Sequence, residues 1–183
     1  VDSAMIADYA MRHADKAELW RPLGESLSQL RELFLYRHRL VRHRCSFEVR
    51  NSEKNLTLEK SPVKKLMRHS SDRIIAQINR EIAQCEKAIR ELIASDEEIN
   101  RIYGIITSMP GIGMINAVCL IVYTENFRRF GFNARKIATY YGVAPFGKYS
   151  GTSIHTEPHV SPFANRTIKS LLSQAALAAI RFN

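Results

Sequence analysis

The sequence predicts an all-α or mainly α-helical protein, in which a long antiparallel coiled-coil stalk precedes a small helical domain. Apolar residues recur every three or four positions over two long stretches, and a polar stretch separates them. The small domain is predicted by a Pro-Gly-Ile-Gly turn at residues 110–113, which lies between two apolar segments with helical periodicity. We also expect one short β-hairpin within this domain, before its last helix.

The composition bounds both the size and the partners of the protein. With 183 residues the chain can bury a real core, as one domain or two small ones. Its 27 Lys and Arg against 18 Asp and Glu give a net charge of +9, which favours a polyanionic partner such as DNA or RNA over an acidic membrane surface. Membrane-spanning apolar runs are lacking in the sequence, so no membrane partner is expected. The cysteines are widely spaced and lie on apolar stripes, which predicts buried free thiols in a reducing compartment such as the cytoplasm: Cys45, Cys85 and Cys119.

The first helices follow from periodicity. A short helix is expected at residues 3–13, and Arg21-Pro22 breaks the chain before a long helix from about residue 23 to residue 50. Arg37 interrupts the apolar seam of the long helix, which consists of Leu23, Leu27, Leu30, Phe34 and Val41. The same helix is rich in cations, among them Arg37, Arg39, Arg42, Arg44 and Arg50. Two interpretations stay open for them: a solvated helix face, or contact with a nucleic-acid backbone.

A second long helix is expected to pair with the first. Residues 51–61 are polar and predict a loop or a helix tip, and Ser71-Asp72 is a suitable helix start. The seam that follows keeps a heptad spacing, with Asp96 as its one polar exception: Ile75, Ile78, Ile82, Cys85, Ile89, Leu92 and Ile99. Two matching seams joined by a polar stretch predict an antiparallel coiled coil. Such stalks space domains or join protomers, so a homo-oligomer is expected.

Residues 102–123 have the pattern of a helix-hairpin-helix unit. Gly111 and Gly113 would let the backbone approach a phosphate, and the helix at residues 114–123 would present its unpaired N-terminal amides to it. A plain tight turn is the alternative. Arg128 and Arg129 follow, flanked by aromatic residues in a way that suits a nucleic-acid surface.

A possible nucleophile follows the next helix. Asn133 should cap a helix at residues 134–141, and Gly142 should end it in a left-handed conformation. Pro145 and Gly147 are then expected to prevent regular structure from resuming, which leaves residues 148–151 on an exposed turn or at the start of a short strand. Ser150, next to Gly151 and two residues after Lys148, could attack a phosphate or a carbonyl. It could equally be an ordinary turn serine.

The final segments predict a hairpin and a helix. Residues 152–160 alternate loosely and carry three possible metal ligands, for which a solvated surface is the favoured interpretation because a fourth ligand is missing: His155, Glu157 and His159. Ser161-Pro162 should start the last helix, which carries Asn165, Arg166 and Lys169 in its first turns. Its remaining apolar stripe is expected to pack in the core: Ile168, Leu171, Leu172, Ala175 and Ala176.

The order of these motifs resembles a known family. The sequence runs from Pro110-Gly-Ile-Gly through Phe130 and Ile137-Ala-x-Tyr-Tyr-Gly-Val-x-Pro145 to Ser150-Gly151. It then continues with Val160-Ser-x-x-x-Asn165-Arg-x-x-Lys169, and the whole is similar to the C-terminal domain of the IS110 family of bacterial insertion-sequence transposases. The opening, from Asp2 to Tyr9, resembles the tail of that family's nuclease-like domain. Phe163-Ala164 depart from the family pattern, which commonly has a basic residue and glycine there.

The resemblance implies a domain order and a chemistry. Residues 1–20 would be the tail of a truncated RuvC-like nuclease domain, 21–100 the coiled coil and 101–183 the transposase domain. The family implies a recombinase guided by a structured RNA, in which Ser150 attacks a DNA phosphate to form a covalent phosphoserine link, with Ser153 as the fallback. Asp2 would be the last of four acids that bind magnesium, in a composite site shared between protomers. Lys148, Arg166 and Lys169 are the candidate phosphate contacts.

Two other functions are weighed against this expectation. The chain could be a non-catalytic helix-hairpin-helix module on a dimerising stalk, with Ser150 as a turn residue only. A purely structural scaffold explains neither the basic surplus nor the glycine hairpin. Because three of the four implied acids are not in this sequence, we expect a fragment that neither cleaves nor rejoins DNA by itself.

Overall fold

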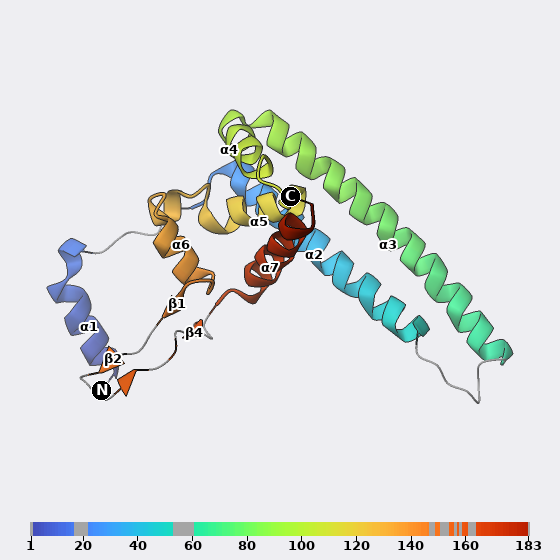
Figure 1. The fold of residues 1–183 in the computed structure, drawn as a ribbon, viewed down its shortest axis with the longest axis horizontal. Helices are drawn as coiled ribbons and strands as arrows, with labels where there is room; N and C mark the ends of the chain where they lie inside the picture. Colours follow the sequence, from blue (N-terminus) through green and yellow to red (C-terminus); the bar gives the residue numbers. More distant parts are fainter. Residues whose placement is uncertain are drawn as a thin grey trace.

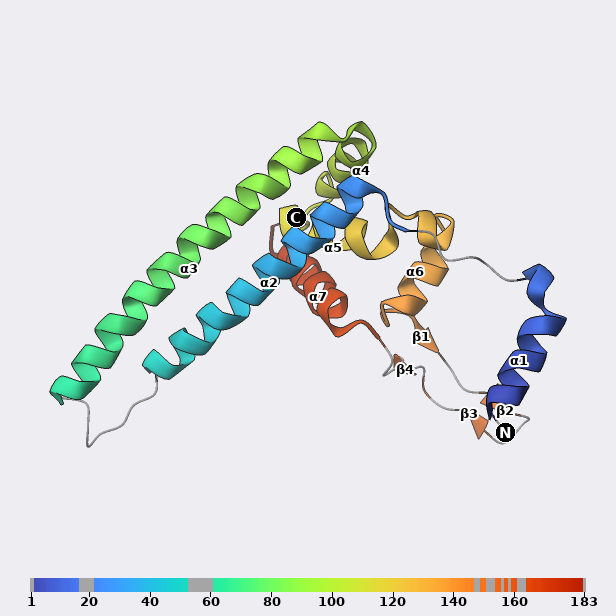
Figure 2. The same cartoon turned by 180° about the vertical axis from the view of Figure 1, so that it is seen from behind.

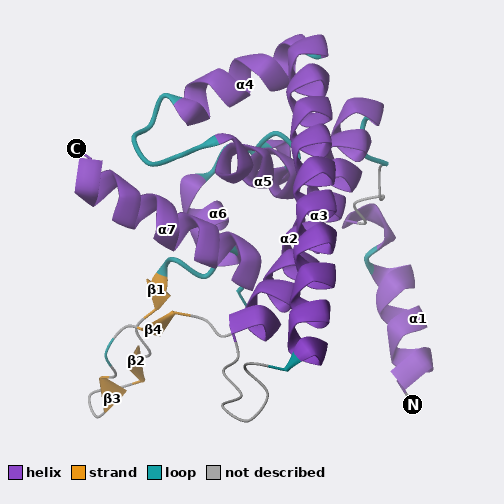
Figure 3. Ribbon diagram, turned by 90° about the vertical axis from the view of Figure 1, so that its right-hand side faces the viewer, coloured by secondary structure: helices purple, strands orange, loops and turns teal. Residues whose placement is uncertain are grey.

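The computed structural model describes residues 2–16, 22–52, 61–146, 149–150, 154–155, 157, 159–160 and 164–182. Within these residues the protein is mainly helical, as predicted, and its only strands are four two-residue segments (Figure 1; Figure 3).

The stalk consists of α2 (Glu25–Ser52) and α3 (Pro62–Ser95), which lie side by side and antiparallel (Figure 1; Figure 2). Leu30 and Phe34 of α2 are buried against Cys85 and Ile89 of α3. The predicted seam is therefore confirmed. Burial of such side chains stabilises the pair by about 1.5–3 kcal/mol each, which is the main reason that these helices associate.

Three side-chain hydrogen bonds fix the register of the stalk. The Arg37 guanidinium donates to Glu86 Oε1 at 2.8 Å, Arg44 Nη1 donates to Asn79 Oδ1 at 3.2 Å, and Asn51 Nδ2 donates to Asp72 Oδ1 at 3.1 Å. Successive partners lie seven residues apart on both helices, so the pairing keeps one heptad register along the stalk. Arg37 is the polar exception in the apolar seam of α2, and its charge is matched by the Glu86 carboxylate on the facing side of α3.

The predicted limits of the second stalk helix were wrong at both ends. α3 begins at Pro62, because the Ser61 side chain accepts a hydrogen bond from Val63 N at 3.2 Å and proline suits the first helical position. Ser71 and Asp72 lie inside the helix. At the other end Asp96 stops α3 and caps α4 (Glu97–Thr107), with its carboxylate accepting from Ile99 N at 3.0 Å.

The core of the small domain is α5 (Met114–Thr124), which is apolar on all sides. Residues 117–122 are all buried, and α2, α4 and α7 (Arg166–Phe182) pack around this helix. A helix that is hydrophobic all round belongs at the centre of a domain. Cys119 lies in this core and Cys85 in the stalk seam, whereas Cys45 is exposed, which corrects the prediction that all three thiols are buried.

A left-handed loop connects α5 to the next elements. Glu125, Asn126 and Phe127 have φ of 52°, 57° and 65°, and η2 (Arg128–Phe130) follows them. Asn133 then caps α6 (Ala134–Tyr140), since its Oδ1 accepts from the backbone N of residues 135 and 136 at 3.0 and 3.1 Å. Gly142 has φ of 63°, so the predicted cap and the predicted helix end are both confirmed.

The strands form one extended β-arm. β1 (Pro145–Phe146) pairs with β4 (His159–Val160), and β2 (Tyr149–Ser150) pairs with β3 (Ile154–His155), both antiparallel. The hairpin was predicted within residues 152–160, and Pro145 was expected to prevent regular structure from resuming before a turn or a short strand start at residues 148–151. The expectation for Pro145 was wrong, because β1 begins at Pro145 itself, at a position where the ladder needs no N–H donor from proline.

The last and first helices differ in how they are attached. The predicted start of the last helix at Ser161-Pro162 was wrong, because Asn165 caps α7: its Oδ1 accepts from the backbone N of residues 167 and 168 at 3.1 and 3.3 Å. In the last helix Ile168 and Ala175 are buried, but Ala176 is exposed. α1 (Asp2–Arg12) is exposed along its whole length, and its main neighbour is η1 (Ala14–Lys16).

Candidate functional site

The β-arm carries the candidate nucleophile. Ser150 is the last residue of β2 and pairs with Ile154 of β3, so that its backbone lies at the end of the arm remote from the helices (Figure 1; Figure 3). Of the two predicted settings, an exposed turn or a short strand, the strand is observed. Lys148, Gly151 and the alternative Ser153 lie outside the described residues.

An aromatic cluster anchors the base of this arm. Tyr141 is fully buried, and its ring lies 5.2 Å from that of Tyr140 and 6.3 Å from that of Phe130. Burial raises the pKa of the Tyr141 hydroxyl, which therefore stays neutral, and the hydroxyl has no hydrogen-bond partner among the described residues. The residue before the Gly142 turn is thus packed in the core, which fixes the point from which β1 leaves the helical domain.

The start of α7 lies at the other side of the arm's base, because β4 precedes it. Asn165, a predicted nucleic-acid contact, uses its side-chain oxygen to cap the helix. Arg166 is exposed and Lys169 is half-buried, and neither has a side-chain partner in the described part of the chain. Two cations at a helix N-terminus, where the helix dipole also favours anions, suit a phosphate.

A tight turn joins α4 to α5 at the predicted Pro-Gly-Ile-Gly segment, and its two glycines have different surroundings. Gly111 has φ of 83°, and a Cβ there would collide with the backbone of Ala175 and Ala179 in α7. This close approach is therefore to a helix of the same chain, and not to open solvent. Gly113 has no neighbouring atom within 4 Å of a built Cβ and precedes α5 without any side-chain cap, so the amides of that helix start remain open.

Arg128 and Arg129, beside this unit, are both engaged. Arg128 Nη2 lies 2.6 Å from Glu98 Oε2, in an ion pair that links η2 to α4. The Arg129 guanidinium lies over the rings of Tyr140 and Phe130, 5.0 and 5.7 Å from their centroids. Because Arg129 remains exposed and meets no acid among the described residues, its charge is the more available of the two.

The four predicted stalk arginines fall into two pairs. Arg37 and Arg44 point across the seam, to Glu86 and to Asn79, and Arg44 Nε also lies 3.4 Å from Glu48 Oε1. Arg39 and Arg42 are exposed and have no partner within the described ranges. The structure thus leaves Arg39 and Arg42 free to meet phosphate and gives the other two a role in the stalk.

The small domain is similar to a known protein family. Residues 103–183, which comprise most of α4 together with α5, α6, the β-arm and α7, match the family described as "Transposase IS116/IS110/IS902 family". These residues are similar to an IS110-family transposase domain and are called the transposase domain. The predicted resemblance is confirmed over this domain, and Ser150 lies within it.

Relatives of known name extend beyond the transposase domain. The chain is 35% identical over 94 residues to the "Insertion element IS110 uncharacterized 43.6 kDa protein" of Streptomyces coelicolor, covering 51% of this chain and 23% of that protein. It is 26% identical over 176 residues to the "Pilin gene-inverting protein" of Moraxella bovis and, equally, to that of Moraxella lacunata. The latter matches cover 96% of this chain, which spans about half the length (51%) of each of those relatives. None of the described helices could cross a bilayer.

Asp2, the predicted metal ligand, lies outside the transposase domain at the start of α1. Its helix overlaps the tip of the β-arm in Figure 1, but the two lie on opposite sides of the molecule in Figure 3, so one chain does not bring Asp2 next to Ser150. No group of three or more His, Cys, Asp or Glu side chains in the described ranges could hold a metal ion. The described residues alone therefore do not fit a magnesium site.

The strongest feature that sequence reasoning missed is the loop after α5. Asn126 is 2% exposed, has a left-handed backbone, and its Oδ1 has no partner in the described part. The loop is held by Thr124, whose Oγ1 accepts from Phe127 N at 2.9 Å. Asparagine tolerates a left-handed backbone better than most residues do. Glutamate and phenylalanine rarely adopt it, so the sequence Glu-Asn-Phe does not predict three consecutive left-handed residues.

Proposed function

We propose that the chain is part of a DNA recombinase of an insertion sequence, which cuts and rejoins DNA through a covalent phosphoserine link formed by Ser150. The match of residues 103–183 to the transposase family carries this proposal. The strand position of Ser150, at the tip of an arm that projects from the domain core, is compatible with access to a DNA backbone.

In the proposed step Ser150 Oγ attacks a DNA phosphorus atom. A bond forms between Oγ and phosphorus, the bond to one deoxyribose oxygen breaks, and the serine's proton leaves as that oxygen is protonated. Because one phosphoester replaces another, the energy of the bond is kept for rejoining. Arg166 and Lys169, at the start of the helix that follows the arm, are described cations that could offset the negative charge of the phosphate.

The test is Ser150→Ala in the full-length protein, with a donor and target DNA and its RNA. The variant should lose the covalent protein–DNA adduct, read on a denaturing gel, and strand exchange, while it still binds DNA. Ser153→Ala is the matched control and should keep the adduct. An adduct that persists in Ser150→Ala would eliminate Ser150 as the nucleophile. An unmodified protein that binds DNA but forms no adduct would favour the rival function, a non-catalytic nucleic-acid-binding module.

The remaining parts of the proposal concern partners and metal. A structured guide RNA encoded by the element would direct the recombinase, and the basic surplus of +9 supports a nucleic-acid partner of this kind. Magnesium would be held mainly by acids that this chain does not contribute, with Asp2 as one ligand. Since the described residues supply no such site, we propose that the chain alone neither cleaves nor rejoins DNA.

We also propose that the stalk joins protomers in a bacterial cytoplasm. In the observed register Ser52, the last described residue of α2, lies opposite residue 71, so α3 extends about two turns beyond it. Three apolar side chains are uncovered on this extension: Val63 at 63%, Leu66 at 68% and Met67 at 53% exposed. Burial of such a stripe against the same stripe of a second copy would favour a homo-oligomer.

A further inference from the structure

The stalk presents its free arginines on one face only. Arg37, Arg44 and Asn51 bond across to α3, so helical geometry places the residues near 39, 42, 46 and 50 on the opposite side of α2. The face from residue 39 to residue 50 carries three exposed arginines and the hydroxyl of Ser46 between the last two. We call this set the inner stripe: Arg39, Arg42, Ser46 and Arg50.

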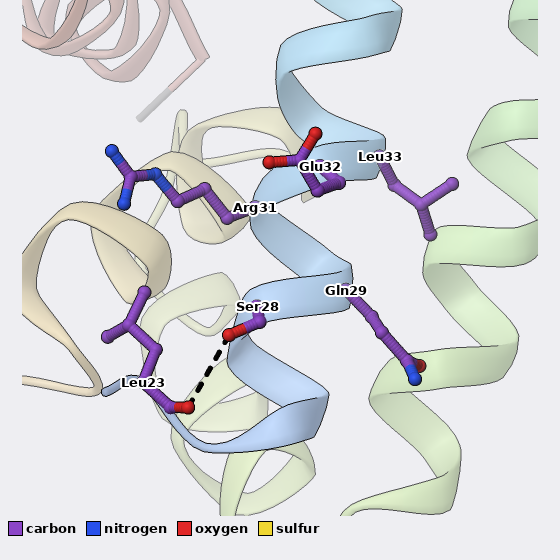
Figure 4. A pocket seen from close by; sticks show the side chains of 6 residues that line it. All are labelled: Leu23, Ser28, Gln29, Arg31, Glu32 and Leu33. Atoms are coloured by element: carbon purple, nitrogen blue, oxygen red, sulfur yellow. Dashed lines mark hydrogen bonds between the residues drawn. The ribbon is translucent and has the colours of Figure 1, made fainter.

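No acid offsets the charge of the inner stripe. Glu48, the acid on this stretch of α2, lies on the seam side, where its carboxylate is 3.4 Å from Arg44 Nε. None of the three arginines has a hydrogen-bond or ion-pair partner in the described part of the chain. Near the start of α2 a cation and an acid are neighbours, Arg31 and Glu32. Both line a shallow depression in which the polar side chains do not converge on one point (Figure 4).

The fold turns this stripe towards the β-arm. Figures 1 and 2 show α2 on the side of the stalk that faces α7 and the arm, with α3 on the outer side. Because the inner stripe is on the face of α2 remote from α3, it lies on the same side of the stalk as the arm, whereas the outer face of α3 lies on the other side.

We propose that the inner stripe binds the backbone of duplex DNA beside the site of strand exchange. Arg42 and Arg50 are eight residues, or about 12 Å, apart along the helix axis. The major groove of B-DNA is also about 12 Å wide, so these two arginines can contact phosphates on both walls of the groove. A-form RNA has a deep and narrow major groove, and its wide groove is the shallow minor groove lined by 2′-hydroxyl groups, so an RNA hairpin is the competing ligand in the test. This inference rests on the proposed function in one respect, namely that DNA is the substrate.

The test compares two triple variants of the full-length protein. The first, Arg39→Gln with Arg42→Gln and Arg50→Gln, removes the inner stripe. The second removes the same number of cations from the outer face of α3: Arg73→Gln, Arg80→Gln and Lys87→Gln. Both lower the net charge by three, so the loss of net charge is the same in the two variants. The second set consists of exposed residues, of which Lys87 lies 3.8 Å from Glu91 and Arg80 donates to Gln77. Thermal unfolding followed by circular dichroism confirms that both variants are folded.

The readout is affinity for a random-sequence DNA duplex as a function of salt. Each phosphate contact contributes roughly 0.9 to the slope of log affinity against log salt, so loss of three should reduce the slope by about 2.7. From roughly 50 to 200 mM salt the unmodified protein should then lose about 40-fold more affinity than the inner-stripe variant. The outer-face variant should keep the original slope.

Three outcomes would overturn the inference: equal slopes for the two variants, an unchanged slope for the inner-stripe variant, or a loss of binding confined to an RNA hairpin. The adduct assay with Ser150→Ala is a separate measurement. If Ser150 proves to be the nucleophile while the inner stripe leaves DNA affinity unchanged, the recombinase proposal stands and this inference fails.

Discussion

The two glycines of the α4–α5 turn show how one residue type serves two purposes. Two features require glycine at position 111. Its backbone is left-handed, and the backbone of α7 leaves no room for a Cβ atom. Gly113 has an extended backbone, with φ of −88° and ψ of 177°, which any residue adopts. Its contribution is the space it leaves in front of the open amides of α5.

Gly111→Ala should destabilise the protein by about 2–4 kcal/mol, because left-handed strain adds to a clash that only a shift of α7 can relieve. Gly113→Ala should cost less than about 1 kcal/mol, as alanine caps a helix slightly worse than glycine. Urea unfolding of both variants measures the difference. Equal losses would show that the hairpin does not pack on α7 as described.

At the scale of the element, Asp96 joins the stalk to the transposase domain. Its carboxylate accepts from Ile99 N, and the hydrogen bonds from that backbone N–H and from the Ser26 hydroxyl hold the pKa of Asp96 below its usual value. The charge thus sits at the N-terminus of α4, where the helix dipole favours it. One residue ends α3 and starts α4, so the chain bends there without a loop.

Asp96→Ala should lower the free energy of unfolding by about 1 kcal/mol at neutral pH, and Asp96→Asn by less, since asparagine can still cap. Because the folded-state pKa is depressed, this stability is present above the unfolded pKa near 3.8 and disappears as the pH falls through the folded value. Denaturant unfolding between neutral and strongly acidic pH measures it. A stability difference between the unmodified protein and the Asp96→Ala variant that persists in strong acid would contradict this origin.

Periodicity predicted the helices, and what it could not predict has physical reasons. The seam from Ile75 to Ile89 is a local pattern, so it appears in the sequence. The true start at Ser61-Pro62 was missed because Ser71-Asp72 is an equally good cap by composition, and only the Asn51–Asp72 contact shows it to be interior. Likewise, which arginines of α2 face α3 depends on register, a property of two helices together. The setting of Ser150 followed from a glycine-ended helix, but its strand partner did not.

The whole molecule consists of parts with very unequal burial. α5 has seven buried residues, 117–122 and 124, whereas α1 has none and exposes apolar side chains, among them Ile6 at 69% and Met11 at 81%. Figure 3 shows α1 and the β-arm set apart from the helical core on opposite sides. Stability should therefore be distributed unevenly along the chain.

Amide hydrogen exchange should reflect this distribution, with α5 exchanging only through global unfolding and α1 exchanging fastest among the described helices. Mass spectrometry of peptides from the two helices provides the measurement. Protection of α1 that approaches the protection of α5 would mean that another surface covers α1 in solution.

The repeat of the three cross-helix bonds makes the stalk adjustable in whole steps. Removing residues 38–44 together with residues 79–85 would delete one bonded pair and still leave Arg37 opposite Glu86 and Asn51 opposite Asp72. Such an excision would shorten the stalk by about 10 Å without rotating either helix. Excising five residues from each helix would instead rotate the apolar seam beyond the excision by roughly 140° about the helix axis. A change in the length of the stalk that keeps this repeat of bonds therefore comes in units of seven residues.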